Sequence, residues 1–182
     1  MKRPNPTHLS YGLLAAIGES GASTTELVEM LSRGHMYHSW SASQVYAEPK
    51  RLLALGWVTS EKQPAHTRHR TVYRLTEAGC EALRDHLRRP SGWPRIQHEA
   101  AQRLFAGDMI TDEEILASLR QLRADVDELR RIVEKNVARI PLIPARRARY
   151  ATLLQDLGRR LVEAHADWLD EVERELGPTN RQ

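Results

Sequence analysis

The sequence is poor in cysteine and in aromatic residues. Cys80 is the only cysteine among 182 residues, so the chain cannot form an internal disulfide or a zinc site built from several cysteines. Phe, Trp and Tyr together make up 5% of the residues, whereas apolar residues as a whole reach 41%. The core must therefore be built mainly from Leu, Ile, Val and Ala. A Leu- and Ala-rich composition favours helices.

Long apolar runs and catalytic motifs are also missing. The longest apolar run, residues 13–17, is far too short to span a bilayer. The start, Met1-Lys2-Arg3-Pro4, leads into no apolar segment of the kind found in secretory signals. No nucleophile–histidine–acid motif, phosphate-binding loop or metal motif occurs. These absences predict a cytoplasmic protein that is not an enzyme, binds no cofactor and does not associate with membranes.

The small net charge of +3 hides an asymmetry between the two halves of the chain. Residues 1–90 carry twelve Lys and Arg against eight Asp and Glu, a balance of +4, whereas residues 91–182 carry fifteen against sixteen. The junction, 89–94, contains two prolines and a glycine, which is typical of a domain boundary. A basic half joined to a near-neutral half indicates two domains with different roles.

The first half alternates apolar patterns of period 3.6 with two short β-type runs. Apolar residues at helical spacing predict three helices, and Ser or Thr residues stand where helix N-caps are needed. A polar loop separates the two β-type runs, which favours a hairpin. The predicted elements are a helix over 9–17, a helix starting at Ser23 or Thr24, a helix from Ser41 or Ser43 to Gly56, strands at 57–60 and 71–75, and a helix from Thr76 to Arg88.

This order of elements is that of a winged helix-turn-helix domain. In such a domain the third helix enters the major groove of DNA, and the hairpin, or wing, lies along the backbone. Because phosphates attract cations, the basic residues of both elements are candidate contacts. Lys50 and Arg51 are expected opposite the apolar face of the third helix. The residues predicted to contact DNA are Ser41, Ser43, Gln44, Tyr46, Lys50, Arg51, Arg68, His69 and Arg70.

Two stretches of the first half carry a family resemblance: residues 43–52 followed by Leu55-Gly56-Trp57-Val58, and Tyr73-Arg74-Leu75-Thr76-Glu77-Ala78-Gly79. They are similar, respectively, to the third helix and to the wing exit of the PadR family of bacterial transcriptional regulators. The second half resembles the longer of the family's helical dimerisation regions. The resemblance implies a regulator that represses transcription until a small molecule releases it from DNA.

The third helix departs from the family pattern at Pro49. The family commonly has proline directly after the tyrosine, where Ala47 follows Tyr46 here, and leucine at the position of Pro49. Proline inside a helix removes one hydrogen bond and costs about 3 kcal/mol. We therefore expect either a kink between Val45 and Pro49 or a short turn followed by a helix with Pro49 at its first position.

The second half predicts a short helix over 96–105 and two long helices. Thr111 and Glu114 form a capping box, and apolar residues then follow in steps of four and three to Ile140, with Asn136 at one seam position. The last helix is expected from Ala145 to Leu176. Its predicted inner face consists of Leu154, Leu157, Leu161, Trp168 and Val172.

These patterns predict a mainly α protein with a small β-hairpin. Residues 1–90 form a winged helix-turn-helix DNA-binding domain, and 91–182 form a coiled-coil-like helical dimerisation domain. Because the long helices carry more apolar surface than one pair can cover, a homodimer is expected on a near-palindromic operator in double-stranded DNA. Trp93 and Trp168 are candidates for stacking on a flat effector, although tryptophan in a helical stripe is more often part of a core.

Several alternatives stay open. The basic loop could be an ordinary solvated turn, and Tyr46 could pack internally. The pairs His35/His38 and His66/His69 have metal-ligand spacing, but without cysteine or carboxylate partners they do not predict a metal site. The main rival function is a winged-helix module that binds proteins and not DNA.

Overall fold

The computed structural model describes residues 5–38, 40–64, 70–94 and 96–178. The chain divides into two compact units, Met1–Trp93 and Pro94–Gln182, which we call the winged unit and the helical arm. No helix in the described ranges is long and apolar enough to cross a membrane.

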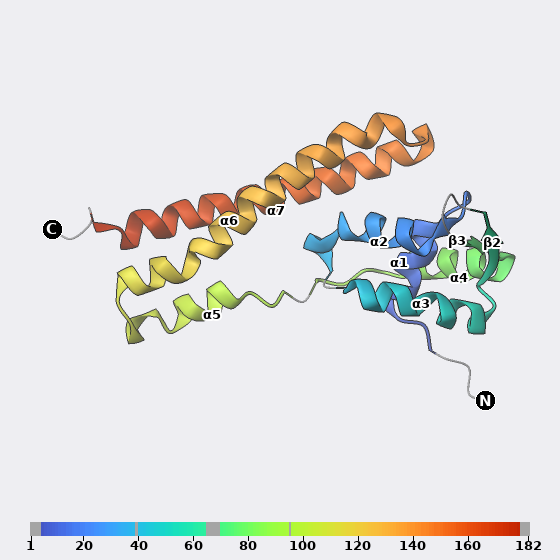
Figure 1. Ribbon diagram of the computed structural model, residues 1–182. Coiled ribbons are helices and arrows are strands. Elements are labelled where there is room, and N and C mark those ends of the chain that lie inside the picture. The colour runs from blue at the N-terminus through green and yellow to red at the C-terminus, as the bar shows by residue number, and fades with distance from the viewer. Residues whose placement is uncertain (1–4, 39, 65–69, 95, 179–182) are drawn as a thin grey trace. The chain divides into compact units, whose positions relative to one another are not determined.

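In its described residues the winged unit has four α-helices and a small sheet (Figure 1). The predicted N-cap Thr76 is confirmed. Of the two alternatives at the second helix it is Ser23 that forms the cap, and of those at the third helix it is Ser41. Each of these side chains accepts a hydrogen bond from the backbone N–H three residues on, which satisfies a donor that has no partner inside the helix. The elements are α1 His8–Ile17, β1 Ala22–Ser23, α2 Thr24–Ser32, η1 His35–Tyr37, α3 Ala42–Leu55, β2 Val58–Gln63, β3 Arg70–Leu75 and α4 Glu77–Arg88.

The sheet has three antiparallel strands in the order β1-β3-β2. The hairpin is confirmed, with Val58 opposite Leu75 and Gln63 opposite Arg70. The two-residue strand β1, paired with Tyr73 and Val72, was not predicted because two residues carry no periodicity. Gly21, which precedes β1, has φ +78°, and a Cβ there would lie 2.8 Å from the Tyr73 carbonyl oxygen. Only glycine allows this entry into the sheet.

Aliphatic side chains form the core of the winged unit. The hydrophobic residues of this unit with no exposed surface are Leu13, Leu14, Ile17, Leu27 and Leu52, which come from α1, α2 and α3. Three helices therefore share one apolar centre without a single Phe, as the composition predicts. This core fixes the position of α3, whose other face is open to solvent.

The third helix is continuous through Pro49. α3 runs from Ala42 to Leu55, so the expectation of a helix that begins at Pro49 is wrong. The proline lacks the N–H that would bond the Val45 carbonyl, but its ring is almost completely buried. That burial offsets part of the cost. The capping box at Ser41 and the left-handed Gly56, at φ +72°, hold the two ends of the helix.

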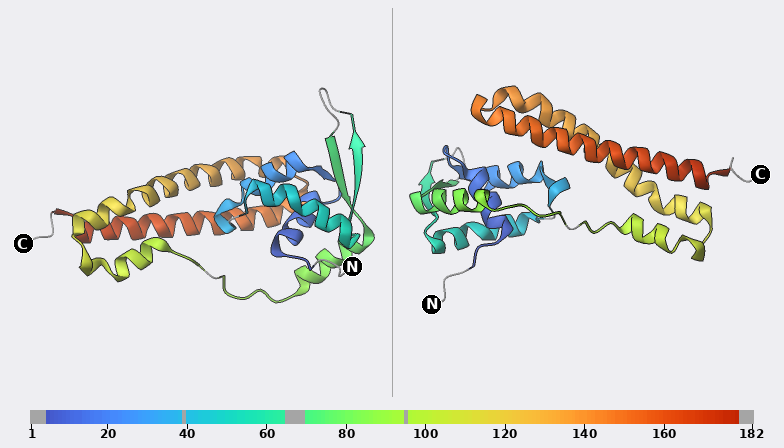
Figure 2. Two further views of the ribbon diagram at one scale, coloured as in Figure 1. Left: turned by 60° about the horizontal axis from the view of Figure 1, so that its bottom comes forward. Right: turned by 180° about the vertical axis from the view of Figure 1, so that it is seen from behind.

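The helical arm is built on a long helical pair. Figures 1 and 2 show α6 and α7 side by side along their lengths. Arg130 of α6 bonds both carboxylate oxygens of Glu163 of α7, at 3.1 and 3.2 Å, and this fork aligns the two helices. The elements are α5 Glu99–Phe105, η2 Gly107–Met109, α6 Asp112–Arg139, η3 Ile140–Leu142 and α7 Ala145–Leu176.

The face that α7 turns toward α6 differs from the prediction. The seam on α6 is confirmed, with Ile115, Leu119, Val126 and Val133 buried. On α7 the buried residues are Gly158, Val162, Ala166 and Leu169, whereas the predicted inner residues Leu154, Leu157 and Leu161 are 37–48% exposed. The small and β-branched side chains of α7 let the helices approach closely, and the leucines are left on the outside.

The short helix before α6 is also shorter than predicted. α5 starts at Glu99 and not at residue 96, because the His98 side chain accepts a hydrogen bond from Ala101 N–H and acts as the N-cap. Ile96 therefore lies before the helix and is exposed, and Phe105, the last residue of α5, is exposed as well.

Candidate nucleic-acid interface

The start of α3 presents a polar, solvent-exposed face. Ser41 and Gln44 form a reciprocal cap, in which Ser41 N–H donates to Gln44 Oε1 at 2.8 Å and Gln44 N–H donates to Ser41 Oγ at 3.3 Å. The Ser43 hydroxyl lies 2.9 Å from that of Ser41. Gln44 therefore uses its amide oxygen in the cap, and its NH₂ group is the part that can read a base edge.

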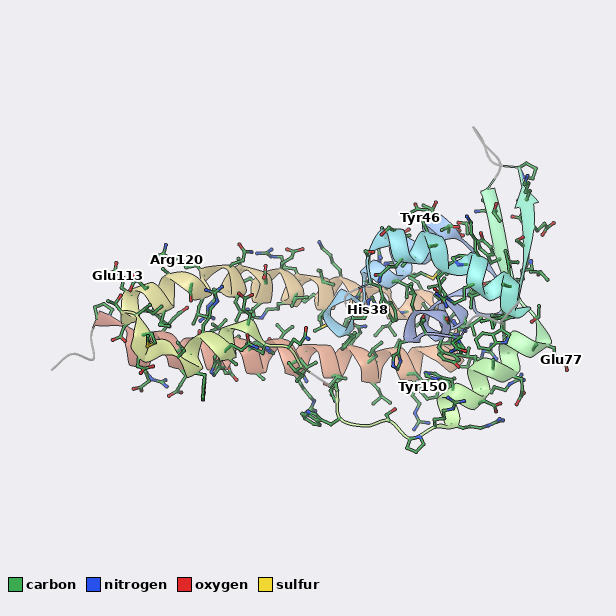
Figure 3. All side chains as sticks on the ribbon, turned by 90° about the horizontal axis from the view of Figure 1, so that it is seen from below. His38, Tyr46, Glu77, Glu113, Arg120 and Tyr150 are labelled. Carbon is green, nitrogen blue, oxygen red and sulfur yellow. The ribbon has the colours of Figure 1, made fainter. Side chains whose placement is uncertain are left out.

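Tyr46 and Lys50 extend this face along the helix. Tyr46 is 54% exposed and lies on the outer side of α3 (Figure 3). The alternative that Tyr46 packs internally is therefore not what the structure shows. Lys50 is one turn further along and is also exposed. An aromatic hydroxyl, an amide and an ammonium group on one open helix face can contact phosphates and base edges.

A buried carboxylate fastens the opposite face of α3 to the start of α1. Glu48 is only 6% exposed. Its carboxylate accepts hydrogen bonds from the Ser10 hydroxyl, from the Thr7 hydroxyl at 3.4 Å and from Arg51 Nε at 3.2 Å. Arg51 also donates to the Asn5 carbonyl at 2.9 Å. Because a buried charge needs all of its hydrogen bonds, this network holds α3 in one orientation.

The network changes the role of Arg51. The sequence places Arg51 beside Lys50 on the outer face, but its guanidinium turns back to Glu48 and Asn5. Lys50 is therefore the cation of the outer face at this point of α3. The local sequence pattern does not indicate this role of Glu48, because its partners Ser10 and Thr7 are 38 and 41 residues away.

We expect Ser10→Ala to lower the free energy of unfolding by about 1.5–3 kcal/mol, the usual value of a hydrogen bond to a charged group. The change leaves the Glu48 carboxylate buried with one donor fewer, and it also removes the hydroxyl that accepts the Thr7 N–H at 2.9 Å in the capping box of α1. Thermal or urea unfolding measures the loss, and Ser60→Ala, at an exposed position of β2, is the matched control. A Ser10→Ala variant as stable as the control would show that the network contributes nothing.

The described charges of the wing lie along both of its strands, and Arg70 lies at the end next to the loop. Arg70 opens β3, where its guanidinium lies 3.5 Å from Glu26 Oε1 and 3.3 Å from Gln63 Oε1. The Ser23 backbone N–H and hydroxyl donate to Glu26 and hold the pKa of that carboxyl below its ordinary value. Arg68 and His69, the other predicted wing residues, lie outside the described residues. Lys62 is a further exposed cation of the wing, on β2, and the basic loop pattern does not include it.

The two candidate tryptophans belong to different units. Trp93, at the end of the winged unit, is 87% exposed. Trp168 is half-buried on α7, with its ring edge-on to His98 at 5.5 Å. Within the described part of the chain no three His, Cys, Asp or Glu side chains are placed to hold a metal ion.

Two protein-family models match this chain, one within each of its two units. A family model described as the transcriptional regulator PadR-like family matches residues 13–85, and one described as virulence activator alpha C-term matches residues 96–177. None of the curated proteins matches the chain.

Solved structures share the fold at low sequence identity. PadR of Bacillus subtilis in complex with operator DNA is 20% identical, with 94% of this chain and 98% of that chain covered and a TM-score of 0.75. The PadR-like regulator BC1756 of Bacillus cereus is 13% identical, with 94% and 99% covered and a TM-score of 0.77. The virulence activator AphA of Vibrio cholerae is 23% identical, with 94% and 99% covered and a TM-score of 0.69. The Bacillus subtilis protein has also been solved with p-coumaric acid.

Proposed function

The chain belongs to the PadR-like family of transcriptional regulators, a family without enzymatic activity, and we propose that its winged unit binds operator DNA through α3 and the wing. The observation that carries this proposal is the two-sided character of α3. Its inner face is fastened to α1 through Glu48, and its outer face presents Gln44, Tyr46 and Lys50 to solvent. A rigidly held helix with an open polar face suits insertion into a major groove.

The proposal extends to assembly and regulation. The exposed leucines of α7 support a homodimer, which would bind a near-palindromic operator, and the chain would act as a repressor released by a small molecule. The structures of the Bacillus subtilis protein, bound to operator DNA in one case and to p-coumaric acid in another, support both parts. A repressor of this kind works in the cytoplasm.

We expect Lys50 and Gln44 to affect DNA binding differently. After an operator has been selected from random double-stranded DNA, Lys50→Ala should weaken binding to all sequences alike and reduce the slope of log affinity against log salt by about 0.9, as one lost phosphate contact would. Gln44→Glu keeps the capping box with Ser41 but replaces the NH₂ donor, so it should change the preferred base at one position of each half-site.

Fluorescence anisotropy over a salt series, and a second selection with Gln44→Glu, measure these effects. Lys135→Ala, an exposed lysine of α6, is the control and should leave both affinity and slope unchanged. Absence of DNA binding at low salt would favour the rival, a winged-helix module that binds proteins. Identical behaviour of the Lys50 and Gln44 variants would contradict the role assigned to α3.

A further inference from the structure

Two of the arginines predicted to contact DNA are paired with carboxylates in the structure, and the two pairs differ in burial. Arg51 pairs with Glu48, which is buried and accepts further hydrogen bonds from α1 and the residue before it. Arg70 of β3 pairs with Glu26 of α2, and the side chains of this pair are 50% and 45% exposed. The first pair is a fixed part of the fold, whereas the second is open to exchange with a partner from solvent.

The geometry of the Glu26–Arg70 pair also indicates a weak contact. Arg70 Nη1 lies 3.5 Å from Glu26 Oε1. The other carboxylate oxygen, Oε2, accepts the N–H and the hydroxyl of Ser23, both at 2.7 Å, in the capping box of α2. A hydrogen bond between a cationic N–H and a carboxylate is ordinarily about 2.7–2.9 Å long. An exposed pair at a longer distance contributes little stability, so Arg70 can leave Glu26 easily.

The Glu26 carboxylate nevertheless keeps its charge at neutral pH. The backbone and hydroxyl hydrogen bonds from Ser23 are the main cause of the lowered pKa of Glu26, and the charge of Arg70 makes a smaller contribution in the same direction. A permanent negative charge therefore lies beside an arginine that is expected to bind phosphate. Because carboxylate and phosphate are both anions, they compete for the guanidinium and repel each other.

Arg70 lies where a phosphate can reach it. It is opposite Gln63 at the end of the hairpin next to the loop, and the strands of the hairpin extend away from the helices of the winged unit (Figure 2). Gln63 Oε1 accepts a hydrogen bond from Arg70 Nη2 at 3.3 Å. A guanidinium has five N–H donors, so several remain for a phosphate beside the bonds to Glu26 and Gln63.

We propose that Glu26 limits the affinity of the winged unit for DNA by competing with phosphate for Arg70. This inference rests on the proposed function and refines it, since it adds an internal competitor to the wing. DNA that reaches the wing must either draw Arg70 away from Glu26 or hold its phosphates close to the carboxylate, and both lower the affinity. Because phosphate contacts do not depend on sequence, the affinity for every duplex is lowered alike.

Such a competitor has a use in a protein that must find one operator among many other sites. Binding to unrelated DNA depends almost entirely on phosphate contacts, and unrelated sites greatly outnumber the operator. A weaker phosphate contact at the wing shortens the time that the chain spends on each of them.

Glu26→Gln in the full chain tests the competition. Glutamine removes the charge but keeps a side-chain oxygen for the bonds from Ser23, and it is a regular partner in a capping box. We expect the variant to bind both the selected operator and an unrelated duplex about threefold more tightly at low salt, which corresponds to one exposed ion pair. Fluorescence anisotropy over a salt series measures both affinities, and the gain should shrink as salt screens the charges.

Glu29→Gln is the matched control. Glu29 is exposed one turn further along α2, and it pairs with Arg33 as Glu26 pairs with Arg70. Both substitutions change the net charge equally and break one exposed ion pair of an arginine, but only Arg70 belongs to the wing. Glu29→Gln should therefore change the DNA affinity much less than Glu26→Gln does.

Arg70→Ala completes a double-mutant cycle with Glu26→Gln. If Glu26 acts through Arg70, then Glu26→Gln should have no more effect than Glu29→Gln once residue 70 is alanine. A gain in affinity that persists without Arg70 would be a general effect of net charge and would overturn the inference. Circular dichroism of all variants shows whether each has kept its fold.

The remaining outcomes separate this inference from the proposed function. Unchanged binding of Glu26→Gln would overturn the inference, and so would weaker binding, which would mean that Glu26 positions Arg70 for DNA. A gain confined to the operator would contradict competition for a phosphate. In each of these cases the wild type still binds its operator and the proposed function stands. A wild-type chain that binds no DNA would refute the proposed function and this inference together.

Discussion

Replacing Gly79 with alanine should lower the free energy of unfolding of the winged unit by about 3 kcal/mol, at the upper end of the cost of overpacking. A Cβ at residue 79 would lie 2.0 Å from the Trp57 carbonyl oxygen. That oxygen also accepts a hydrogen bond from Thr76 N–H at 3.1 Å, so backbone is packed on backbone and no side chain can rotate away. Either α4 or the start of the sheet must move.

A glycine can be required because another group approaches its Cα closely or because its backbone has a positive φ. Comparing Gly79→Ala with a substitution at Gly56 separates these two causes. Gly56 is the matched control, because it has φ +72° and nothing within 4 Å of its ideal Cβ position. Gly56→Asn should cost little, since asparagine tolerates the left-handed region. Thermal unfolding of both variants should show a large drop for Gly79→Ala only, about 12–24 °C for a domain of this size. Equal, small drops would mean that α4 can move away from Trp57 freely.

Gly79 also explains why the short motif Thr76-Glu77-Ala78-Gly79 is informative about the fold. Thr76 caps α4 and donates from its hydroxyl to the Gly56 carbonyl at 2.7 Å, and Gly79 accommodates the strand entry at Trp57. The phrase 76–79 thus specifies both the start of a helix and its contact with the sheet. Its resemblance to winged-helix proteins has a physical cause in this contact.

The features that could be predicted from the sequence are those with local causes. The capping boxes at Ser41 and Thr111 join residues three apart, and the apolar seam of α6 repeats over seven residues. The winged helix-turn-helix fold follows from the order of such elements. The outward position of Tyr46 and Lys50 likewise follows from their places on a helix whose other face is apolar.

The features that could not be predicted depend on partners distant in the chain. From the sequence alone, Glu48 looks like an exposed acidic residue of a helix. In the structure its carboxylate accepts hydrogen bonds from Ser10 and Thr7, and Arg51 turns toward it. A hollow of the winged unit is lined by residues of α1, η1 and α4, which are up to 79 positions apart, from His8 to Leu87. Helical periodicity shows which face of a single helix is apolar, but it does not show which helices pack against one another.

The exposed leucines of α7 are a second feature whose packing partner the sequence does not identify, and that partner determines how the chain assembles. A leucine stripe can face the next helix of its own chain or another copy of the chain, and the two alternatives have the same period. The α6–α7 pair closes on the smaller residues Gly158, Val162 and Ala166. The stripe that remains exposed consists of Tyr150, Leu153, Leu154, Leu157 and Leu161. A continuous apolar face of this kind is characteristic of an interface.

Leu157→Glu should convert the proposed homodimer into a monomer. Leu157 is 48% exposed at the middle of the stripe, so a charge there costs nothing in the isolated arm but would be buried in a symmetric contact. Because two linked half-site contacts become one, operator affinity should fall by about 100-fold or more. Sedimentation velocity gives the oligomeric state, and anisotropy with the full operator and with a single half-site gives the affinities.

The half-site measurement shows whether a loss of operator affinity comes from lost dimerisation or from damage to the DNA-binding surface. If Leu157→Glu acts only through assembly, its affinity for an isolated half-site should equal that of the wild type, since α3 and the wing are untouched. Thr152→Glu adds the same charge on the same helix outside the stripe, and should leave both the mass and the operator affinity unchanged. A Leu157→Glu variant that still sediments as a dimer would assign the interface to another surface. A wild-type chain that is monomeric when bound to its operator would disprove the homodimer itself.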